Sequence, residues 1–271
     1  MKKFLCLCCL FAFFLTLVQP ATAEENIPNI ATGAFVASSP ASLNTITVAL
    51  GKASQENKFV FLLVRDKQDE AIAAVKKTVE ATVQKVADKA IALELDRNLP
   101  AEKETVEKYG LLRAPMPLVL VIAPNGAVTL GMVGDKATSE KLEAALVSQG
   151  LQRLIKAMQD RKLVLLCVQN ANTKSNDAAM QGAKDFKADP RFGNDVEIIQ
   201  VDPADANEEK LFSQLKIDPK TTEAVTTLLA PPGAAIGTFS GPTTKEKIEA
   251  ALISATSGGC GSGCASSGCG N

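Results

Sequence analysis

The sequence contains no histidine and no tryptophan, and it has one tyrosine among 271 residues. The absence of histidine excludes Ser–His and Cys–His nucleophile pairs, histidine general bases and every metal site that needs an imidazole ligand. Positive charge is not concentrated anywhere, because 29 lysines and arginines nearly balance 30 aspartates and glutamates and no basic stretch occurs. We therefore do not expect nucleic acid as a partner.

The first residues have the three parts of a secretory signal peptide. Two lysines precede an apolar run at 4–18, and small residues at 21–23 follow it. The run is shorter than the ~20 apolar residues that a membrane-spanning helix needs, and no second run of spanning length follows. We expect residues 1–23 to be removed, which leaves a protein of the periplasm or the extracellular medium with no membrane span.

Strand-like and helix-like segments alternate between residues 59 and 147. The continuous apolar run at 59–64 is typical of a strand buried on both faces of a sheet, and 69–88 has the apolar spacing of an amphipathic helix. Further elements are expected as strands at 90–95, 118–122 and 127–133, and as helices at 101–109 and 139–147. The Pro124-Asn125-Gly126 turn predicts a hairpin between the last two strands, and the first two strands should be parallel.

The second half of the sequence repeats this order. The offset is 104 residues between Lys58 and Lys162 and 106 residues between the motifs EKLEAAL at 140–146 and EKIEAAL at 246–252. A nearly constant offset indicates an internal duplication. We predict an α/β protein with two tandem units, each a mixed four-stranded sheet with flanking helices: unit 1 at 43–149 and unit 2 at 150–256. Residues 24–42 are expected to form an extended lead-in.

The element order, the Tyr109-Gly110-Leu111 segment, the prolines after it and the hairpin together resemble the thioredoxin fold. The resemblance implies a Cys-x-x-Cys motif where the first helix of each unit begins, because the positive helix end there lowers the pKa of the thiol. Neither 65–71 nor 170–177 contains a cysteine. We therefore expect tandem thioredoxin-like units that are redox-inactive.

The resemblance also implies a cis-proline opposite that helix start, before the third strand of the unit. Pro115-Met116-Pro117 occupies this place in unit 1, and the bond before a proline can be cis at small cost. We predict a cis Met116–Pro117 bond and a groove at Met116 and Pro117 for a periplasmic protein partner. Unit 2 has Thr-Glu-Ala at 222–224, so its groove should have lost its shape.

Four cysteines follow the predicted signal peptide. Cys167 lies in an apolar strand, where a thiol acts as a small hydrophobic side chain. Cys260, Cys264 and Cys269 lie in a Gly- and Ser-rich segment at 257–271, which is expected to be a flexible tail. Three thiolates can wrap a soft ion such as Cu(I), whereas zinc would need a fourth ligand. The alternatives are a disulfide with one free thiol, or a tail without dedicated chemistry.

Clustered carboxylates suggest no catalytic site. Those at 94, 96, 102, 104 and 107 are interpreted as a solvated helix face, and those at 202, 205, 208 and 209 as a helix N-terminus. No predicted folded position places a nucleophile beside a base. The preferred function is therefore an exported, non-enzymatic binding or scaffold protein with a tail that binds a soft metal. The alternative is a thiol–disulfide protein whose redox chemistry is carried by the tail cysteines.

Overall fold

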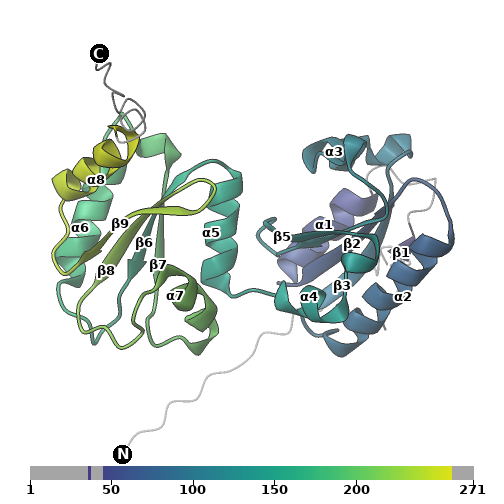
Figure 1. Ribbon diagram of the computed structural model, residues 1–271, viewed down its shortest axis with the longest axis horizontal. Helices are drawn as coiled ribbons and strands as arrows, with labels where there is room; N and C mark the ends of the chain where they lie inside the picture. The colour runs from purple at the N-terminus through teal and green to yellow at the C-terminus, as the bar shows by residue number, and fades with distance from the viewer. Residues whose placement is uncertain (1–35, 38–44, 258–271) are drawn as a thin grey trace, which may run out of the picture. The chain divides into compact units, whose positions relative to one another are not determined.

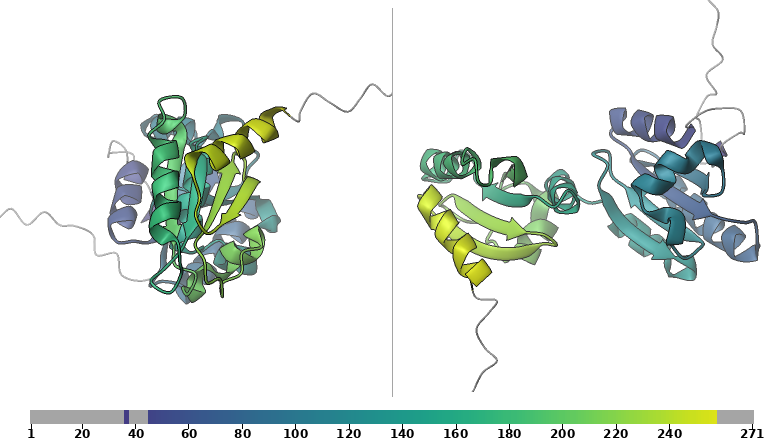
Figure 2. Two further views of the ribbon diagram at one scale, coloured as in Figure 1. Left: turned by 90° about the vertical axis from the view of Figure 1, so that its left-hand side faces the viewer. Right: turned by 90° about the horizontal axis from the view of Figure 1, so that it is seen from above.

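The computed structural model describes residues 36–37 and 45–257. Within these ranges the chain forms two mixed sheets, each covered by helices (Figure 1, Figure 2). This arrangement confirms the predicted fold class of two α/β units. Among the described residues, none of the helices is both long enough and apolar enough to span a membrane.

The sheet of unit 1 has the order β1-β3-β2-β4-β5. Strand β2 (Phe59–Arg65) is central, parallel to β3 (Ala90–Asp96) and antiparallel to β4 (Leu118–Ile122), which forms a hairpin with β5 (Val128–Val133). These four strands match the apolar runs of the sequence. The short β1 (Val36–Ala37) adds a fifth strand beside β3, within the segment predicted to be a lead-in outside the sheet.

Helices cover both faces of this sheet. Helices α2 (Glu70–Lys85) and α4 (Ser139–Ala144) pack against one face, and α1 (Thr45–Gln55) and α3 (Lys103–Lys108) pack against the other. Helix α1 was not predicted. Its sequence, TITVALGKASQ, contains two threonines, a valine and a glycine. These are weak helix formers, so local preference gave little signal.

Unit 2 has the order β7-β6-β8-β9. Its strands are β6 (Leu163–Val168), β7 (Val196–Val201), β8 (Val225–Ala230) and β9 (Ala234–Ser240). Its helices are α5 (Gln149–Gln159), α6 (Asn176–Lys187), α7 (Glu209–Leu215) and α8 (Lys245–Ser257). Helix α5 was also missed, although Leu151, Leu154, Ile155 and Met158 have the three- and four-residue spacing of a buried helix face.

Details of the backbone confirm the duplication. Asn57 and Arg161 follow α1 and α5 and both have positive φ, at 55° and 59°. The two hairpins carry a register shift at equivalent places, at Val121/Ile122 and at Leu228/Leu229. Shared irregularities of this kind allow residues of the two units to be matched one by one.

Candidate functional site

The segment before β4 lies beside the start of α2 because of the strand pairing. The end of β2 pairs with the beginning of β4, so that Val64 is opposite Leu118. The Met116–Pro117 peptide bond is cis, as predicted. The carbonyl of Pro117 accepts a hydrogen bond from Gly134 N at 2.8 Å, which fixes the far side of the segment to the end of β5. The loop at 66–69 follows β2, and the side chain of Arg97 ties its Asp66 to Ala114, just before this segment.

The start of α2 carries a carboxylate where thioredoxin-like oxidoreductases carry a thiol. Asp69 is the N-cap residue, and its Oδ1 accepts a hydrogen bond from Ile72 N at 3.1 Å. This bond and the neighbouring Lys67 hold the pKa of Asp69 below its ordinary value. The positive end of the helix therefore stabilises a capping carboxylate, which cannot exchange disulfides.

A buried charge cluster lies beneath this loop. Glu94 on β3 is 5% exposed and accepts hydrogen bonds from Arg65 Nε at 2.6 Å, Lys76 Nζ at 2.9 Å and Gln68 Nε2 at 3.1 Å. Burial opposes ionisation of Glu94, but the bonds from Lys76 and Arg65 outweigh it, and the pKa of the carboxyl is lowered. The cluster joins β2, β3 and α2 without placing a nucleophile beside a base.

The interpretation of this acidic stretch as a solvated helix face was therefore wrong for Glu94 and also for Glu102, which is 1% exposed. Glu94 lies in the strand that the sequence predicts at 90–95, and its side chain faces α2 instead of solvent. Its neighbours Leu93 and Leu95 point to the opposite face of the sheet, toward α1 and α3. The sequence feature that points to a buried ion pair is Arg65, a basic residue at the end of the adjacent strand.

Arg97 connects the two walls of the site. Its Nη2 donates to Asp66 Oδ2 at 2.8 Å, and its Nη1 donates to the carbonyl of Ala114 at 2.8 Å. Asn98 Nδ2 adds a bond of 2.7 Å to the carbonyl of Asp66. A guanidinium with several fixed donors can hold two loops at once. The site is therefore kept in shape by charge-assisted hydrogen bonds rather than by a disulfide.

The cis segment of unit 1 has an open backbone edge. In the part of the chain that the structure describes, neither the N–H nor the carbonyl of Met116 takes part in a hydrogen bond. Apolar side chains flank it: Met116 is half-buried, Pro115 is exposed, and Leu112 is 66% exposed. A free donor and acceptor next to exposed apolar surface can bind an extended peptide by strand-like pairing.

The equivalent segment of unit 2 is hydrogen-bonded to the chain itself. Thr221 Oγ1 accepts a bond from Glu223 N at 3.3 Å and donates one to the carbonyl of Glu223 at 2.8 Å, and Glu223 is the residue that matches Met116. Lys174 N donates to the carbonyl of Thr222 at 2.9 Å, and Ala224 N donates to the carbonyl of Lys174 at 2.9 Å. Ser175 Oγ also donates to Glu223 Oε2 at 3.0 Å. Ala224 matches Pro117, since each accepts a bond of 2.8 Å from the glycine after its hairpin. Pro117 has no N–H, so unit 1 cannot form the bond that Ala224 makes.

The predicted metal ligands Cys260, Cys264 and Cys269 lie outside the described residues. Cys167 lies in the core of unit 2 and is fully buried, and burial raises the pKa of its thiol to about 11. A thiol in such surroundings is unreactive at neutral pH. Among residues 36–37 and 45–257, no group of three or more Cys, Asp or Glu side chains is arranged to hold a metal ion.

No family model matches the sequence, and no curated protein matches it. Among solved structures, the chain is similar to a thioredoxin from Nicotiana alata, with 17% identity over 43% of this chain and 92% of that chain and a TM-score of 0.33. It is also similar to a redox protein from Chlamydomonas reinhardtii (16% identity, TM-score 0.36), over 45% of this chain but only 37% of that chain.

A third similarity extends over more of the chain. The NTD_N/C domain of the alkylhydroperoxide reductase AhpF from Enterococcus faecalis covers 76% of this chain and 98% of its own length, at 17% identity and a TM-score of 0.29. The two units are thioredoxin-like because of their strand order, their mixed sheets and the placement of the helices on both faces.

Proposed function

We propose that this protein is an exported, non-enzymatic binding protein whose unit 1 holds an extended segment of a periplasmic protein partner beside Met116 and Pro117. The observation that carries the proposal is the contrast between the two units. Among the described residues, neither backbone group of Met116 is hydrogen-bonded in unit 1, whereas both groups of the matching Glu223 bond to Thr221 Oγ1 and Lys174 pairs with the residues on either side of it. One open site on a duplicated scaffold favours one peptide-binding unit and one structural unit.

The chemistry around the site supports binding rather than catalysis. Asp69 caps the helix end, and Glu94 is fully engaged by Arg65, Lys76 and Gln68. A nucleophile needs an adjacent base or a lowered pKa, and the described residues of the site offer no thiol, hydroxyl or amine in that setting. The exposed side chain of Leu112 and the two free backbone groups of Met116 suit a segment that contributes an apolar side chain and a backbone pair.

A peptide-display selection on the mature protein tests the binding site. Selected peptides should lose at least about tenfold in affinity for Pro117→Ala, which supplies the N–H that Ala224 uses to close the segment in unit 2. The matched control is Ala224→Gly at the equivalent position of unit 2, which keeps the N–H and should bind peptides as the unaltered protein does. Peptides that bind Pro117→Ala equally well would place the binding surface elsewhere.

The tail carries the second part of the proposal. Cys260, Cys264 and Cys269 would bind a soft ion such as Cu(I), since thiolates prefer soft metals and Cu(I) accepts three ligands or fewer. The support comes from the sequence alone. Metal content of the mature protein should fall from about one Cu(I) per chain to none in a version ending at Ser257, which keeps α8 complete. Equal metal content in both versions would contradict the proposal.

The alternative function is thiol–disulfide chemistry in the tail. It predicts that the mature protein reduces insulin disulfides and that the version ending at Ser257 does not. Because the only other cysteine of the mature chain, Cys167, is buried, any such activity must come from the tail. Tail-dependent reduction without bound metal would replace the metal proposal and leave the peptide site unaffected.

A further inference from the structure

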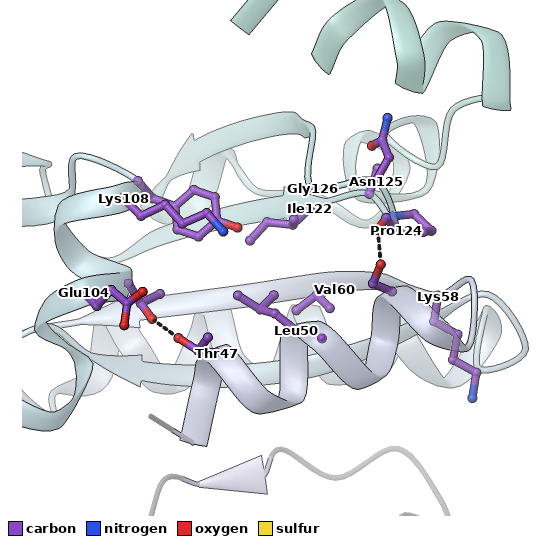
Figure 3. Close-up of a pocket in the computed structure, with 15 residues that line it drawn as sticks. Thr47, Leu50, Lys58, Val60, Glu104, Lys108, Ile122, Pro124, Asn125 and Gly126 are labelled. Atoms are coloured by element: carbon purple, nitrogen blue, oxygen red, sulfur yellow. Dashed lines mark hydrogen bonds between the residues drawn. The ribbon is translucent and has the colours of Figure 1, made fainter. Parts of the chain in front are cut away.

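A pocket of about 380 Å³ lies in unit 1, at the opposite ends of β2 and β4 from the cis bond. Helix α1, helix α3 and the turn between β4 and β5 form its walls. Figure 3 shows Thr47 and Leu50 of α1 on one side and Lys108, Ile122 and Pro124 on the other. Its volume is at the lower end of the range for ligand pockets, so it suits a small molecule rather than a peptide.

The pocket is open because α1 turns small side chains toward it. Thr47, Gly51 and Ser54 lie one turn apart along the lining face of the helix. A Cβ added at Gly51 would meet no atom within 4 Å. Beyond these residues the pocket reaches apolar side chains of the sheet, Val60 and Ile122, which are both buried.

In unit 2, larger aliphatic side chains fill the space that is equivalent to this pocket. The positive-φ residues Asn57 and Arg161 align α1 with α5 at an offset of 104 residues. With this alignment, the residues that replace the small side chains of α1 are Leu151 for Thr47, Ile155 for Gly51 and Met158 for Ser54. On the neighbouring helix, at an offset of 106 residues, Leu211 replaces Thr105. All four aliphatic residues pack in or against the core of unit 2.

The comparison of the two units shows that the fold does not require this pocket to stay open. The fold can fill this space with aliphatic side chains, as unit 2 demonstrates, and a filled core is more stable than an open apolar pocket. Unit 1 instead leaves Leu50 half-buried at an opening that reaches down to the buried side chains of Val60 and Ile122. A bound molecule would supply the contacts that Ile155 and Met158 supply in unit 2.

The polar groups at one end of the pocket define the end group of that molecule. Thr47 Oγ1 and Thr105 Oγ1 share a hydrogen bond of 3.2 Å. Each hydroxyl retains further hydrogen-bonding capacity. Lys108 Nζ lies 5.4 Å from the centre of the Tyr109 ring, and Glu104 lines the same end. The opposite charges of Lys108 and Glu104 offset each other, so neither an anion nor a cation is favoured there.

We propose that this pocket binds a small neutral amphiphile, with an aliphatic or aromatic body against Leu50, Val60 and Ile122 and a hydroxyl or amide end at Thr47 and Thr105. The proposal does not depend on the peptide site. It gives the protein a second binding function, which the duplicated unit has lost through larger side chains.

The only tyrosine of the chain lines the pocket, and there is no tryptophan, so tyrosine emission reports directly on its occupation. Titration of the mature protein with 1-octanol should change this emission saturably, with a dissociation constant between about 0.1 and 1 mM. Each methylene removed from the alcohol should weaken binding about three- to fourfold. Calorimetry on the same samples gives the stoichiometry, expected to be one per chain.

Two variants transfer the filling residues of unit 2 into unit 1. Gly51→Ile with Ser54→Met, and separately Thr105→Leu, should each weaken octanol binding at least about tenfold and raise the thermal midpoint. Val48→Gln is the matched control, because Val48 is 68% exposed on α1, does not line the pocket, and takes the residue that unit 2 has there. Its affinity for octanol should be unchanged.

Three results would overturn the proposal. No saturable signal in either fluorescence or calorimetry would exclude the pocket as a binding site. Equal affinity of the filled variants and the unaltered protein would place the alcohol elsewhere. Octanoate or octylamine binding more than about tenfold tighter than octanol would refute the neutral end group. Pro117→Ala should leave octanol binding intact, so failure here is distinguishable from failure of the peptide site.

Discussion

Replacing Glu94 with glutamine tests whether the buried charge cluster stabilises unit 1. The carboxylate is 5% exposed and accepts three hydrogen bonds, two of them from the charged groups of Arg65 and Lys76. Removing one partner of a buried ion pair costs about 3–5 kcal/mol. The cost here is smaller, because Arg65 keeps its 2.8 Å bond to Asp96 and the Lys76 side chain is already 36% exposed.

We expect Glu94→Gln to lower the free energy of unfolding by about 2 kcal/mol at neutral pH, since an amide of the same shape keeps one acceptor but loses the charge. The effect should depend on pH. The pKa of Glu94 is lowered in the folded state from its ordinary value of 4.5. Its contribution is therefore complete above that ordinary value and is lost as the pH falls through the folded-state pKa.

Urea unfolding followed by tyrosine emission measures this, because the single tyrosine, Tyr109, lies in unit 1. The control is Glu107→Gln, which removes a carboxylate from an exposed helix pair with Lys103 at 3.8 Å. Loss of such an exposed pair should cost less than about 0.5 kcal/mol. A loss for Glu94→Gln no larger than that of the control would refute the argument. So would a loss that is the same in strong acid as at neutral pH.

Three further predictions concern the helices and the buried thiol. Asp69→Ala should destabilise unit 1 by about 1 kcal/mol, because Ile72 N loses its capping acceptor, and the same urea titration measures this. Gly182→Ala should cost at least about 2 kcal/mol by calorimetry. The reason is that its Cβ would lie 1.9 Å from the carbonyl oxygen of Thr243. In the version ending at Ser257, Cys167 should react with a maleimide on the order of 100-fold more slowly in the native than in the unfolded chain, since burial raises the pKa of its thiol to about 11. Equal labelling rates would show that the strand opens readily.

Much of the fold could be predicted because local patterns agree with it. The buried strands read as continuous apolar runs, and the hairpin turn of unit 1 lies where Pro124-Asn125-Gly126 places it. The cis Met116–Pro117 bond could also be predicted, because the resemblance gives its position and the sequence has a proline there. Helices α1 and α5 were missed for opposite reasons. Helix α1 has little helical preference, whereas α5 carries a clear apolar stripe that indicates a helix.

The site was less predictable. Glu94 looked like one of several acidic residues, and its burial depends on Arg65, 29 residues earlier, lying on the adjacent strand. The closure of unit 2 by Lys174 was equally hidden. It needs Thr222 and Ala224 to return beside a loop that lies far from them along the chain. No periodicity or motif records such pairings, because they arise when separate strands meet in one sheet.

The sequence by itself determined that this chain has two related α/β units, no histidine chemistry and no cysteine at either helix start, because composition and repetition are properties of the chain. Tertiary structure decided which of the two units is open. Pro117 and Ala224 differ by one N–H, and Gly51 and Ile155 differ by four carbon atoms. The first difference matters because packing brings Lys174 beside Ala224, and the second because packing leaves unfilled space beside α1. Hydrogen bonds and cavities depend on distances that the order of residues does not specify.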